Sequence, residues 1–380
     1  MNYFLIAGEA SGDLHASNLI KELRKADKNA VFAGLGGDKM RAEGCKLYQD
    51  YREMAYMGVI AVVTNLDKIK KNFQIAQDAI LKEKPDVLVL IDYPSFNLKM
   101  AEFCKKHLPS SKICYYIPPK IWAWKSWRVH KIAQLSDKIL GIFPFEPDFY
   151  QKYGYSCEYI GNPTMDSIRQ WKEEHLETED KLAEIQNEQR EKIIALLPGS
   201  RKNEIKHCLG TMLEAARRIN EETGKQYKII VTAAPGIDEN IYKDYLETGE
   251  ELTRDTYQLI SKASAAVVNS GTATLETALL GCPQTAVYYI ACSKWLGWIK
   301  PFVFRIPYFT LVNIIPGKEV IKEQIAYNFT RKNIENELRK LLNNEPYRNK
   351  MLEEYRQIAS ILGGRPAAKT AAEMIYNHLG

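Results

Sequence analysis

The chain has 380 residues, more than one hydrophobic core normally supports, so two domains are the default expectation. Hydrophobic residues make up 46% and charged residues 26% of the sequence, as in an ordinary globular protein. The 52 lysine and arginine residues barely exceed the 47 aspartate and glutamate residues, and this small excess does not favour a nucleic-acid partner.

The N-terminus enters a predicted strand at once, without the basic stretch and cleavage site of a signal peptide. No stretch is typical of a spanning helix, because Gly281, Pro283 and polar residues interrupt the longest uncharged segment. The seven cysteines are scattered and never in C-x-x-C spacing, which favours buried, reduced thiols in the cytosol. No His, Cys or acidic cluster has the spacing of metal ligands, so we expect no metal and no cofactor.

Short apolar runs alternate with amphipathic helical stretches, such as His15–Lys25 and Leu66–Leu81, and this alternation predicts parallel sheets covered by helices. The predicted strands of the first half are Tyr3–Ala7, Val31–Leu35, Val87–Ile91, Ile113–Ile117 and Ile139–Phe143. Those of the second half are Ile193–Leu197, Tyr227–Thr232, Ala265–Asn269 and Gln284–Tyr289.

We therefore expect an α/β protein with two doubly wound, Rossmann-like domains, residues 1–168 and 193–364. Residues 169–192 are rich in Glu, Lys and Gln, and form either a solvated helix or a charged linker. A last helix at about 365–380 can pack back on the first domain. Doubly wound sheets bind ligands beyond the carboxyl ends of their strands, so we expect the site in a cleft that the two domains face.

Two loops after predicted strands carry acidic residues in the first half. The segment from Gly8 to Asp13 has glycines that allow close approach of a ligand, and Glu9 can orient a substrate, whereas Asp13 suits a helix N-cap. It does not match G-x-G-x-x-G, which argues against a dinucleotide. Asp92 follows a fully apolar strand, where burial raises the proton affinity of a general base; a simple turn residue before Pro94 is the equal alternative.

The segment from Ile121 to Lys131 mixes three tryptophans with basic residues. Given the small charge excess, we interpret it as a wall for a sugar or phosphate, or as cleft packing, rather than as a nucleic-acid surface.

Two loops of the second half suit a diphosphate. Pro198-Gly199 makes a turn, Ser200 can cap the next helix, and Arg201 can clamp a diphosphate, or alternatively pair with Glu204.

In the second of these loops Ser270, Thr272 and Thr274 can donate to phosphate oxygens at a helix N-terminus, and Glu276 can accept from sugar hydroxyls. A hydroxyl-capped helix is the alternative, although a capping box would need Ser or Thr at Ala273. Together the two loops predict a nucleotide-diphosphate site.

Two apolar and basic segments suggest contact with a membrane surface. The residues concerned are Ile60, Val62, Val63, Lys68, Lys70 and Lys71 in the first segment and Trp295, Trp298 and Phe302 in the second. Leu66, Ile69, Phe73 and Ile80 also follow helical spacing, so part of the first segment is expected in the core.

With these residues assembled, the chain resembles the lipid-A-disaccharide synthase family along nearly its whole length. The matching motifs, in order, are Gly8–Asp13, Met57-Gly58, Ile91–Asn97, Trp122-Ala123-Trp124, Pro144-Phe145-Glu146, Ile160–Pro163, Leu196–Arg201, Ser270–Glu276 and Asn313. The resemblance implies an inverting, metal-independent glycosyltransferase of the GT-B architecture. Its substrates would be UDP-2,3-diacylglucosamine and 2,3-diacylglucosamine 1-phosphate, and its products a β-1,6 disaccharide and UDP.

The resemblance also implies residue roles. Asp92 would be the general base and Glu9 would position the acceptor, with Gly8, Ser11, Asn97 and Trp124 as further acceptor contacts. Arg201 would stabilise the departing UDP, whose remaining contacts would be Ser200, Ser270, Gly271, Thr272, Thr274, Glu276 (to the ribose) and Asn313. By its sequence neighbours alone, Asn313 is more typical of an Asn that bonds its own backbone.

By the same resemblance, the protein would be cytoplasmic and peripheral on the inner face of the inner membrane, and compatible with a homodimer. The chain departs from the family's usual residues at Ser95, Pro118, Ala61 and Asn162, so its acceptor side is the less conventional one. A UDP-sugar epimerase of the same fold and a non-catalytic nucleotide-sugar sensor at the membrane are the alternatives.

Overall fold

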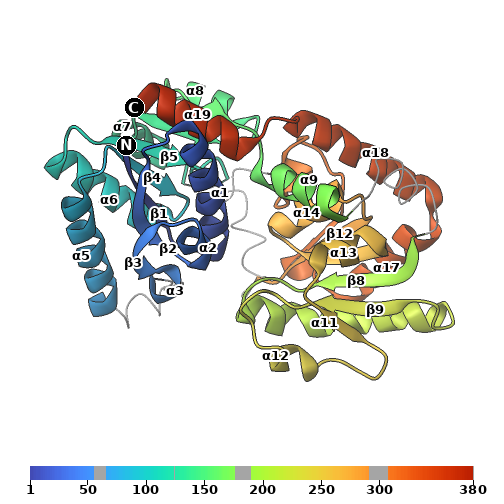
Figure 1. Cartoon of the computed structure of the whole chain (residues 1–380). Coiled ribbons are helices and arrows are strands. Elements are labelled where there is room, and N and C mark those ends of the chain that lie inside the picture. Colours follow the sequence, from blue (N-terminus) through green and yellow to red (C-terminus); the bar gives the residue numbers. More distant parts are fainter. Residues whose placement is uncertain (55–65, 124, 176–189, 291–306, 380) are drawn as a thin grey trace. The chain divides into compact units, whose positions relative to one another are not determined.

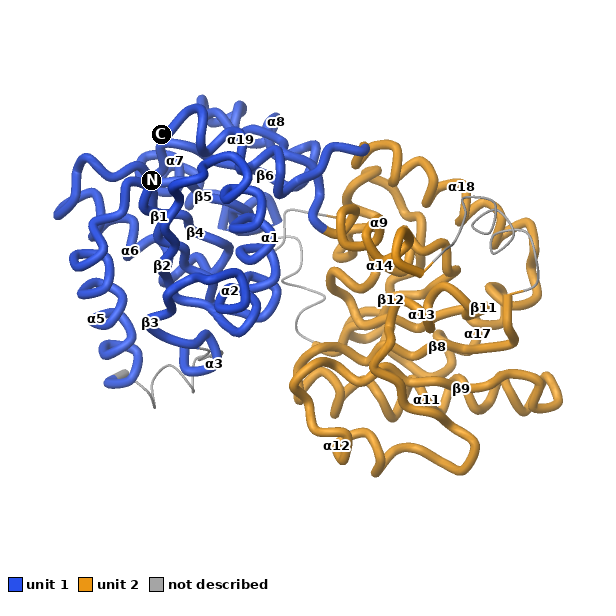
Figure 2. The backbone as a smooth tube through the Cα atoms, in the orientation of Figure 1, with its two compact units in different colours: residues 1–163, 364–380 blue, residues 164–363 orange. Residues whose placement is uncertain are grey.

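The computed structural model describes residues 1–54, 66–123, 125–175, 190–290 and 307–379. These residues form two compact units (Figure 2). The first unit comprises residues 1–163 together with 364–380, and the second comprises residues 164–363. The end of the chain therefore belongs to the unit in which the chain begins.

The first unit is built on a seven-stranded parallel sheet with the order β3-β2-β1-β4-β5-β6-β7. Its strands are β1 (Asn2–Ala7), β2 (Val31–Gly36), β3 (Lys46–Asp50), β4 (Val87–Ile91), β5 (Lys112–Tyr116), β6 (Lys138–Gly141) and β7 (Glu158–Tyr159). Every residue of β4 is buried, as expected for a parallel strand covered by helices on both faces.

Two apolar clusters lie on the two faces of this sheet. The helices of the unit are α1 (Ala10–Ala26), α2 (Asp38–Ala42), α3 (Tyr51–Met54), α5 (Leu66–Glu83), α6 (Pro94–His107), α7 (Arg128–Leu135), α8 (Glu146–Gln151) and α19 (Ala367–Leu379). The C-terminal helix α19 lies against α1 (Figure 1), and its Ala367, Ala371 and Ile375 are buried in the same cluster as Leu19.

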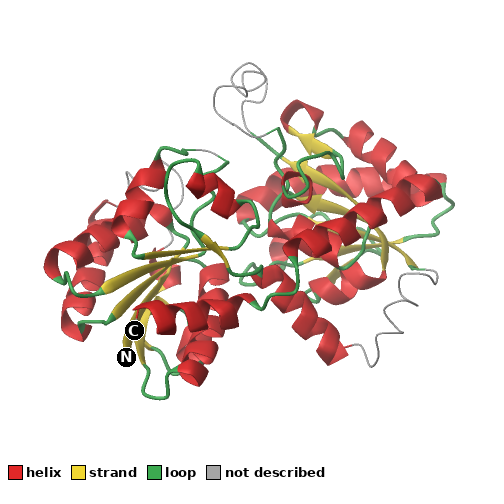
Figure 3. Cartoon of the chain, turned by 90° about the horizontal axis from the view of Figure 1, so that it is seen from above, coloured by secondary structure: helices red, strands yellow, loops and turns green. Residues whose placement is uncertain are grey.

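The second unit repeats this topology with a six-stranded parallel sheet of order β10-β9-β8-β11-β12-β13. Its strands are β8 (Glu191–Leu197), β9 (Lys228–Thr232), β10 (Glu251–Thr253), β11 (Ala263–Asn269), β12 (Gln284–Tyr288) and β13 (Glu323–Ile325). Its helices are α9 (Pro163–His175), α11 (Lys202–Glu222), α12 (Asn240–Lys243), α13 (Thr256–Lys262), α14 (Thr272–Leu279), α16 (Leu311–Ile314), α17 (Arg331–Asn343) and α18 (Glu345–Leu362). Figure 3 shows helices on both faces of each sheet.

The predicted architecture of two doubly wound α/β domains is confirmed. The nine predicted strands are present, with ends that differ by two residues or fewer. The strands β3, β7, β10 and β13 were not predicted. Three of them have only two or three residues, and all lie at or next to a sheet edge, where a long apolar run is not required.

Residues 169–175 of the charged segment belong to α9, and residues 176–189 lie outside the described residues. Six of the cysteines, Cys45, Cys104, Cys114, Cys157, Cys208 and Cys282, are buried free thiols. Within the described ranges, no helix is long and apolar enough to cross a membrane.

Candidate functional site

The strand order of each unit reverses at one place, between β1 and β4 in the first sheet and between β8 and β11 in the second. Loops leave these adjacent strands in opposite directions, which opens a crevice at the carboxyl edge where doubly wound sheets bind ligands. Glu9 and Asp92 follow the paired ends Ala7 and Ile91 of β1 and β4. The loops at Pro198–Arg201 and Asn269–Glu276 follow the paired strands β8 and β11 in the same way. The structure thus places all four predicted loops at the two switch points.

Asp92 stands on an unusual backbone. Asp92 and Tyr93 both have φ of +44°, and Ile117 at the end of the neighbouring β5 has φ of +62°. Left-handed conformations cost non-glycine residues of the order of 1–3 kcal/mol each, and such strain clusters at functional sites. The strain at Asp92 therefore favours a functional role over a simple turn before Pro94.

Hydrogen bonds hold this strained loop in place. The backbone N–H of Asp92 donates to the carbonyl of Ile117 at 3.1 Å. The carbonyl of Asp92 accepts from Asn97 Nδ2 at 2.8 Å and from the Tyr115 hydroxyl at 2.8 Å. Asn97 is fully buried and also donates to the carbonyl of Ile91, so it holds the Asp92 loop in place.

The glycine before Glu9 has a packing role. A Cβ on Gly8 would lie 2.4 Å from the ring of Tyr93, so only glycine lets that ring pack between the loops after β1 and β4. Ser11 is exposed in the first turn of α1. Asp13 is buried and accepts from the backbone N–H groups of the 37–40 segment at 2.8–3.1 Å, so it caps α2 rather than its own helix.

Lys120 is a charged neighbour of Asp92 that the sequence analysis missed. Desolvation by the surrounding protein raises the pKa of the Asp92 carboxyl above its ordinary value, although the residue keeps an exposed surface, and the Lys120 ammonium acts in the opposite direction. Desolvation lowers the pKa of Lys120, and Asp92 and Glu146 partly offset this effect. Strand β5 is next to β4 in the sheet, and Lys120 is the first charged residue after β5. That position in the sequence could have indicated a charged residue near Asp92.

Glu146 ties the tryptophan segment to the end of β6. Its carboxylate accepts from the backbone N–H groups of Ile142 and Phe143 at 2.7 and 2.9 Å and from Trp122 Nε1 at 3.2 Å. Burial raises the pKa of Glu146 to about 7, against these hydrogen bonds. Trp122 also meets Phe143 and Phe145 edge-on, which agrees with the packing interpretation of this segment, whereas Trp124 lies outside the described residues.

In the second unit, the two predicted phosphate loops meet at Gly199. This residue has φ of +119°, and a Cβ there would lie 2.6 Å from both Asn269 Nδ2 and Glu204 Oε2. Arg201 donates from Nη1 to Glu204 Oε1 at 2.9 Å, the pairing that the sequence left as the alternative. Its side chain remains 56% exposed, and exposed pairs contribute little, so the guanidinium can turn to a phosphate at low cost. Ser200 is exposed beside it.

The N-terminus of α14 carries no side-chain cap, which leaves the N–H groups of Thr272 and Ala273 open to an anion, whereas the N–H of Thr274 donates to the carbonyl of Gly271 at 3.4 Å. Ser270 is half-buried, and Gly271 and Thr272 are exposed at this end. Thr274 is different: it is fully buried and its hydroxyl donates to the carbonyl of Gly271 at 2.8 Å. The structure therefore gives Thr274 a bracing role in the loop, because its only hydroxyl proton is already used.

Two further residues that were predicted to bind the UDP-sugar donor have clear hydrogen-bond partners within the protein. Glu276 accepts from the Tyr257 hydroxyl at 3.0 Å, and burial raises the pKa of Glu276 while this bond opposes the shift. Asn313 is fully buried and donates from Nδ2 to the carbonyl of Ile321 and to Glu323, while its oxygen accepts two backbone N–H groups. Asn313 thus braces the segment before β13. This agrees with the expectation from its sequence neighbours that it bonds nearby backbone groups.

The predicted membrane residues are only partly described. Lys68, Lys70 and Lys71 are exposed near the start of α5. Outside the described residues lie Ile60, Val62, Val63, Trp295, Trp298 and Phe302.

Comparison with solved structures first defines the class. The UDP-GlcNAc 2-epimerase of Neisseria meningitidis bound to UDP-GlcNAc shares the fold with a TM-score of 0.67 at 14% identity, over 99% of both chains. The glycotransferase of kitacinnamycin has a TM-score of 0.61 at 12% identity, over 100% of this chain and 99% of its own. The chain thus has the two-unit GT-B architecture, which glycosyltransferases and UDP-sugar epimerases share.

Sequence comparison then defines the particular protein family. The family model described as lipid-A-disaccharide synthetase matches residues 3–375. The lipid-A-disaccharide synthase of Myxococcus xanthus is 33% identical over 99% of this chain and 97% of its own length. That of Nitrosococcus oceani is 34% identical over 97% of this chain and 94% of its own.

The chain belongs to the lipid-A-disaccharide synthase family, so the resemblance predicted from its motifs is confirmed. It is accordingly a glycosyltransferase that forms the disaccharide of lipid A from a UDP-sugar donor and a lipid acceptor.

Proposed function

We propose that the chain transfers the sugar of UDP-2,3-diacylglucosamine to the 6-hydroxyl of 2,3-diacylglucosamine 1-phosphate. The products are the β-1,6-linked disaccharide 1-phosphate and UDP, and the anomeric carbon is inverted. One observation supports this reaction best: Asp92 stands on a strained, hydrogen-bonded loop at the switch point of the first unit, and the two loops predicted to bind a diphosphate stand at that of the second.

Asp92 takes the proton from the 6-hydroxyl of the acceptor as the oxygen attacks the anomeric carbon, and the bond from that carbon to UDP breaks. A raised pKa suits this base, because it holds a transferred proton more firmly than an ordinary aspartate does. Glu9, one strand away at the end of β1, positions the acceptor together with Ser11. Trp124 belongs to the same group of acceptor contacts by its motif.

The leaving diphosphate gains negative charge, and Arg201 and the open N-terminus of α14 stabilise it. Further hydrogen-bond donors for the diphosphate come from exposed or half-buried residues of the two loops, namely Ser200, Ser270, Gly271 and Thr272. Glu276, oriented by Tyr257, accepts from the ribose hydroxyls. Thr274 and Asn313 support the UDP-sugar donor indirectly by bracing the loops. The proposed reaction requires no metal or cofactor.

These roles assign the acceptor to the first domain and the donor to the second. We further propose that the protein is peripheral on the cytoplasmic face of the inner membrane and that it can form a homodimer. The three exposed lysines near the start of α5 support a contact with anionic lipid.

An assay with purified protein tests the reaction. UDP release is measured from UDP-2,3-diacylglucosamine with and without the 1-phosphate acceptor, and the linkage of the product is determined by NMR. Acceptor-dependent UDP release with a β-1,6 product is expected, and it should persist in excess chelator. UDP release without acceptor, or interconversion of UDP-sugars, would contradict the proposal in favour of a hydrolase or an epimerase.

The donor site has its own test, by calorimetric titration with UDP. Arg201→Ala and Glu276→Ala should each weaken binding by roughly tenfold or more, because charge-assisted hydrogen bonds contribute about 1.5–3 kcal/mol. The matched control is Arg218→Ala, which removes an exposed arginine of α11 on the same unit. Unchanged UDP affinity in both site variants would count against the assignment.

A further inference from the structure

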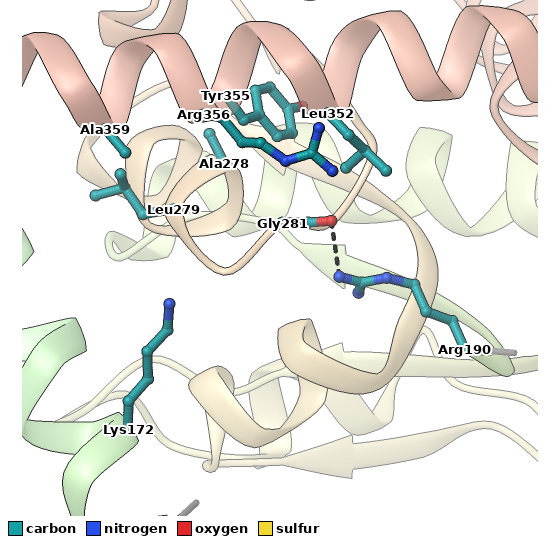
Figure 4. A pocket seen from close by; sticks show the side chains of 9 residues that line it. All are labelled: Lys172, Arg190, Ala278, Leu279, Gly281, Leu352, Tyr355, Arg356 and Ala359. Carbon is teal, nitrogen blue, oxygen red and sulfur yellow. Dashed lines mark hydrogen bonds between the residues drawn. The ribbon is translucent and has the colours of Figure 1, made fainter. Parts of the chain in front are cut away.

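A pocket lies in the second unit at the C-terminal end of α14, between α9 and α18 (Figure 4). Its volume is about 160 Å³, far more than the roughly 10–15 Å³ that a single water requires. The eight residues of α14 separate it from the phosphate loop by roughly 12 Å, at about 1.5 Å per residue. It is therefore distinct from the proposed donor site.

The lining of this pocket is strongly cationic. Lys172 enters from α9, Arg190 precedes β8, and Arg356 comes from α18 (Figure 4). Among the described residues that line the pocket, none is acidic. Leu279 and Leu352 supply apolar surface beside these charges.

The side chain of Lys172 makes no hydrogen bond or ion pair with any residue that the structure describes. Burial lowers the pKa of its ammonium, and no carboxylate among the described residues opposes this shift. A partly buried cation is unfavourable unless an anion neutralises it, and a bound phosphate would do so.

Arg190 provides a fixed positive charge. Its guanidinium donates to the carbonyls of Ile260, Ser261 and Ala263 and to those of Leu280 and Gly281, at 2.7–3.2 Å. These bonds cap the end of α14 and hold the group rigidly, but carbonyl dipoles do not cancel its charge.

Arg356 is the adaptable member of the three. It pairs with Glu353 at 2.7 Å, but both side chains are more than half exposed. Such a surface pair contributes little, so the guanidinium can turn to a ligand in the pocket.

We propose that this pocket binds a phosphate group, as the free ion or as the phosphomonoester headgroup of a lipid, between Lys172 and Arg356. Guanidinium and ammonium groups are the preferred protein partners of phosphate, and the rigid Arg190 adds positive charge to the lining of the pocket. The apolar surface of Leu279 and Leu352 fits the carbon portion of a headgroup. This site goes beyond the transfer reaction and assigns the chain a ligand other than its donor and acceptor.

Calorimetric titration of the full chain, with the donor site saturated by UDP, tests this proposal. The probes are inorganic phosphate and, separately, monomeric dihexanoyl phosphatidic acid. Saturable binding of at least one probe is expected, weakened about tenfold or more by Lys172→Met and by Arg356→Gln. Lys172→Arg should retain binding. The matched control Lys350→Ala, at an exposed position of the same α18, should leave binding unchanged.

Each outcome is decisive once circular dichroism shows that the variants are folded. Lys172-dependent binding of inorganic phosphate identifies the free ion, and Lys172-dependent binding of the lipid probe alone identifies the headgroup. Binding that Arg201→Ala removes and Lys172→Met does not would belong to the donor loop, and would overturn the proposal whether or not UDP binds. Absence of any Lys172-dependent binding would overturn it too.

Discussion

Asp92 combines a raised proton affinity with a left-handed backbone that three hydrogen bonds hold in place. Asp92→Asn keeps the shape but removes the base, so we expect kcat to fall by about 10²–10⁴-fold with UDP affinity unchanged. Steady-state kinetics and calorimetry measure the two quantities.

The control for this variant is Asp86→Asn, at the amino end of the same strand, where the carboxylate accepts from the backbone N–H of Asn2. It should leave kcat near wild type. Wild-type turnover in Asp92→Asn would return Asp92 to the role of a turn residue.

Lys120 acts on the same carboxylate through its charge. Because the ammonium lowers the pKa of Asp92, Lys120→Met should raise that pKa, and the base form would then appear only at higher pH. We expect the acidic limb of the kcat/KM profile to move to higher pH, with the alkaline plateau less affected. A pH–rate series on both proteins measures the shift, and a limb that stays in place or moves to lower pH would show that Lys120 does not influence the base.

Among the elements, the loops after β5 and β6 depend on one buried carboxyl. Glu146 has a pKa of about 7 in the folded chain, against 4.5 for an ordinary glutamate. The folded state therefore binds a proton that the unfolded state has lost between these pH values. The stability from this proton is fully present below pH 4.5 and is lost as the pH rises through about 7.

Glu146→Gln removes this titration while keeping the side chain's size. The unfolding free energy of the wild type, relative to this variant, should fall by about 3 kcal/mol as the pH rises across that window. Urea unfolding of both proteins at several pH values measures it. Glu102→Gln, at an exposed glutamate of α6, is the control and should show a pH-independent difference. If the unfolding free energy of the wild type relative to Glu146→Gln stays constant or increases with pH, burial does not raise the pKa of Glu146.

At the scale of the whole molecule, the proposed peripheral location requires a surface that contacts lipid. Replacing Lys68, Lys70 and Lys71 by Glu reverses three charges and should weaken binding to anionic vesicles by about 100-fold, since each lysine contributes about 1 kcal/mol near such a surface. Vesicle sedimentation at low and high salt measures this, and UDP affinity should not change.

The control for the membrane prediction is the same reversal at Lys225, Lys228 and Lys243, three exposed lysines of the second unit. Equal loss of vesicle binding in both triple variants would indicate a dependence on net charge alone. Unchanged binding in the α5 variant would remove these lysines from the membrane contact.

The central strands and the positions of the four loops could be predicted because each depends on a local pattern. A buried parallel strand needs an unbroken apolar run, as in Val87–Ile91, and a loop at its carboxyl end follows directly. The partners of the site residues could not be predicted in this way. Tyr257 bonds Glu276 across 19 positions, and Trp122 bonds Glu146 across 24, so strand order and helix packing bring these pairs together.

By itself, the sequence determined the two doubly wound sheets, the switch-point loops and, through its ordered motifs, the family. Alternating apolar runs and small-residue turns depend on neighbours along the chain, so they can be recognised from the sequence alone. Only the tertiary structure decided that Thr274 and Asn313 turn inward as braces, that Asp13 caps α2, and that Lys120 acts on the Asp92 carboxylate. The direction and charge environment of a loop side chain depend on contacts with distant segments, and those contacts exist only once the sheet has assembled.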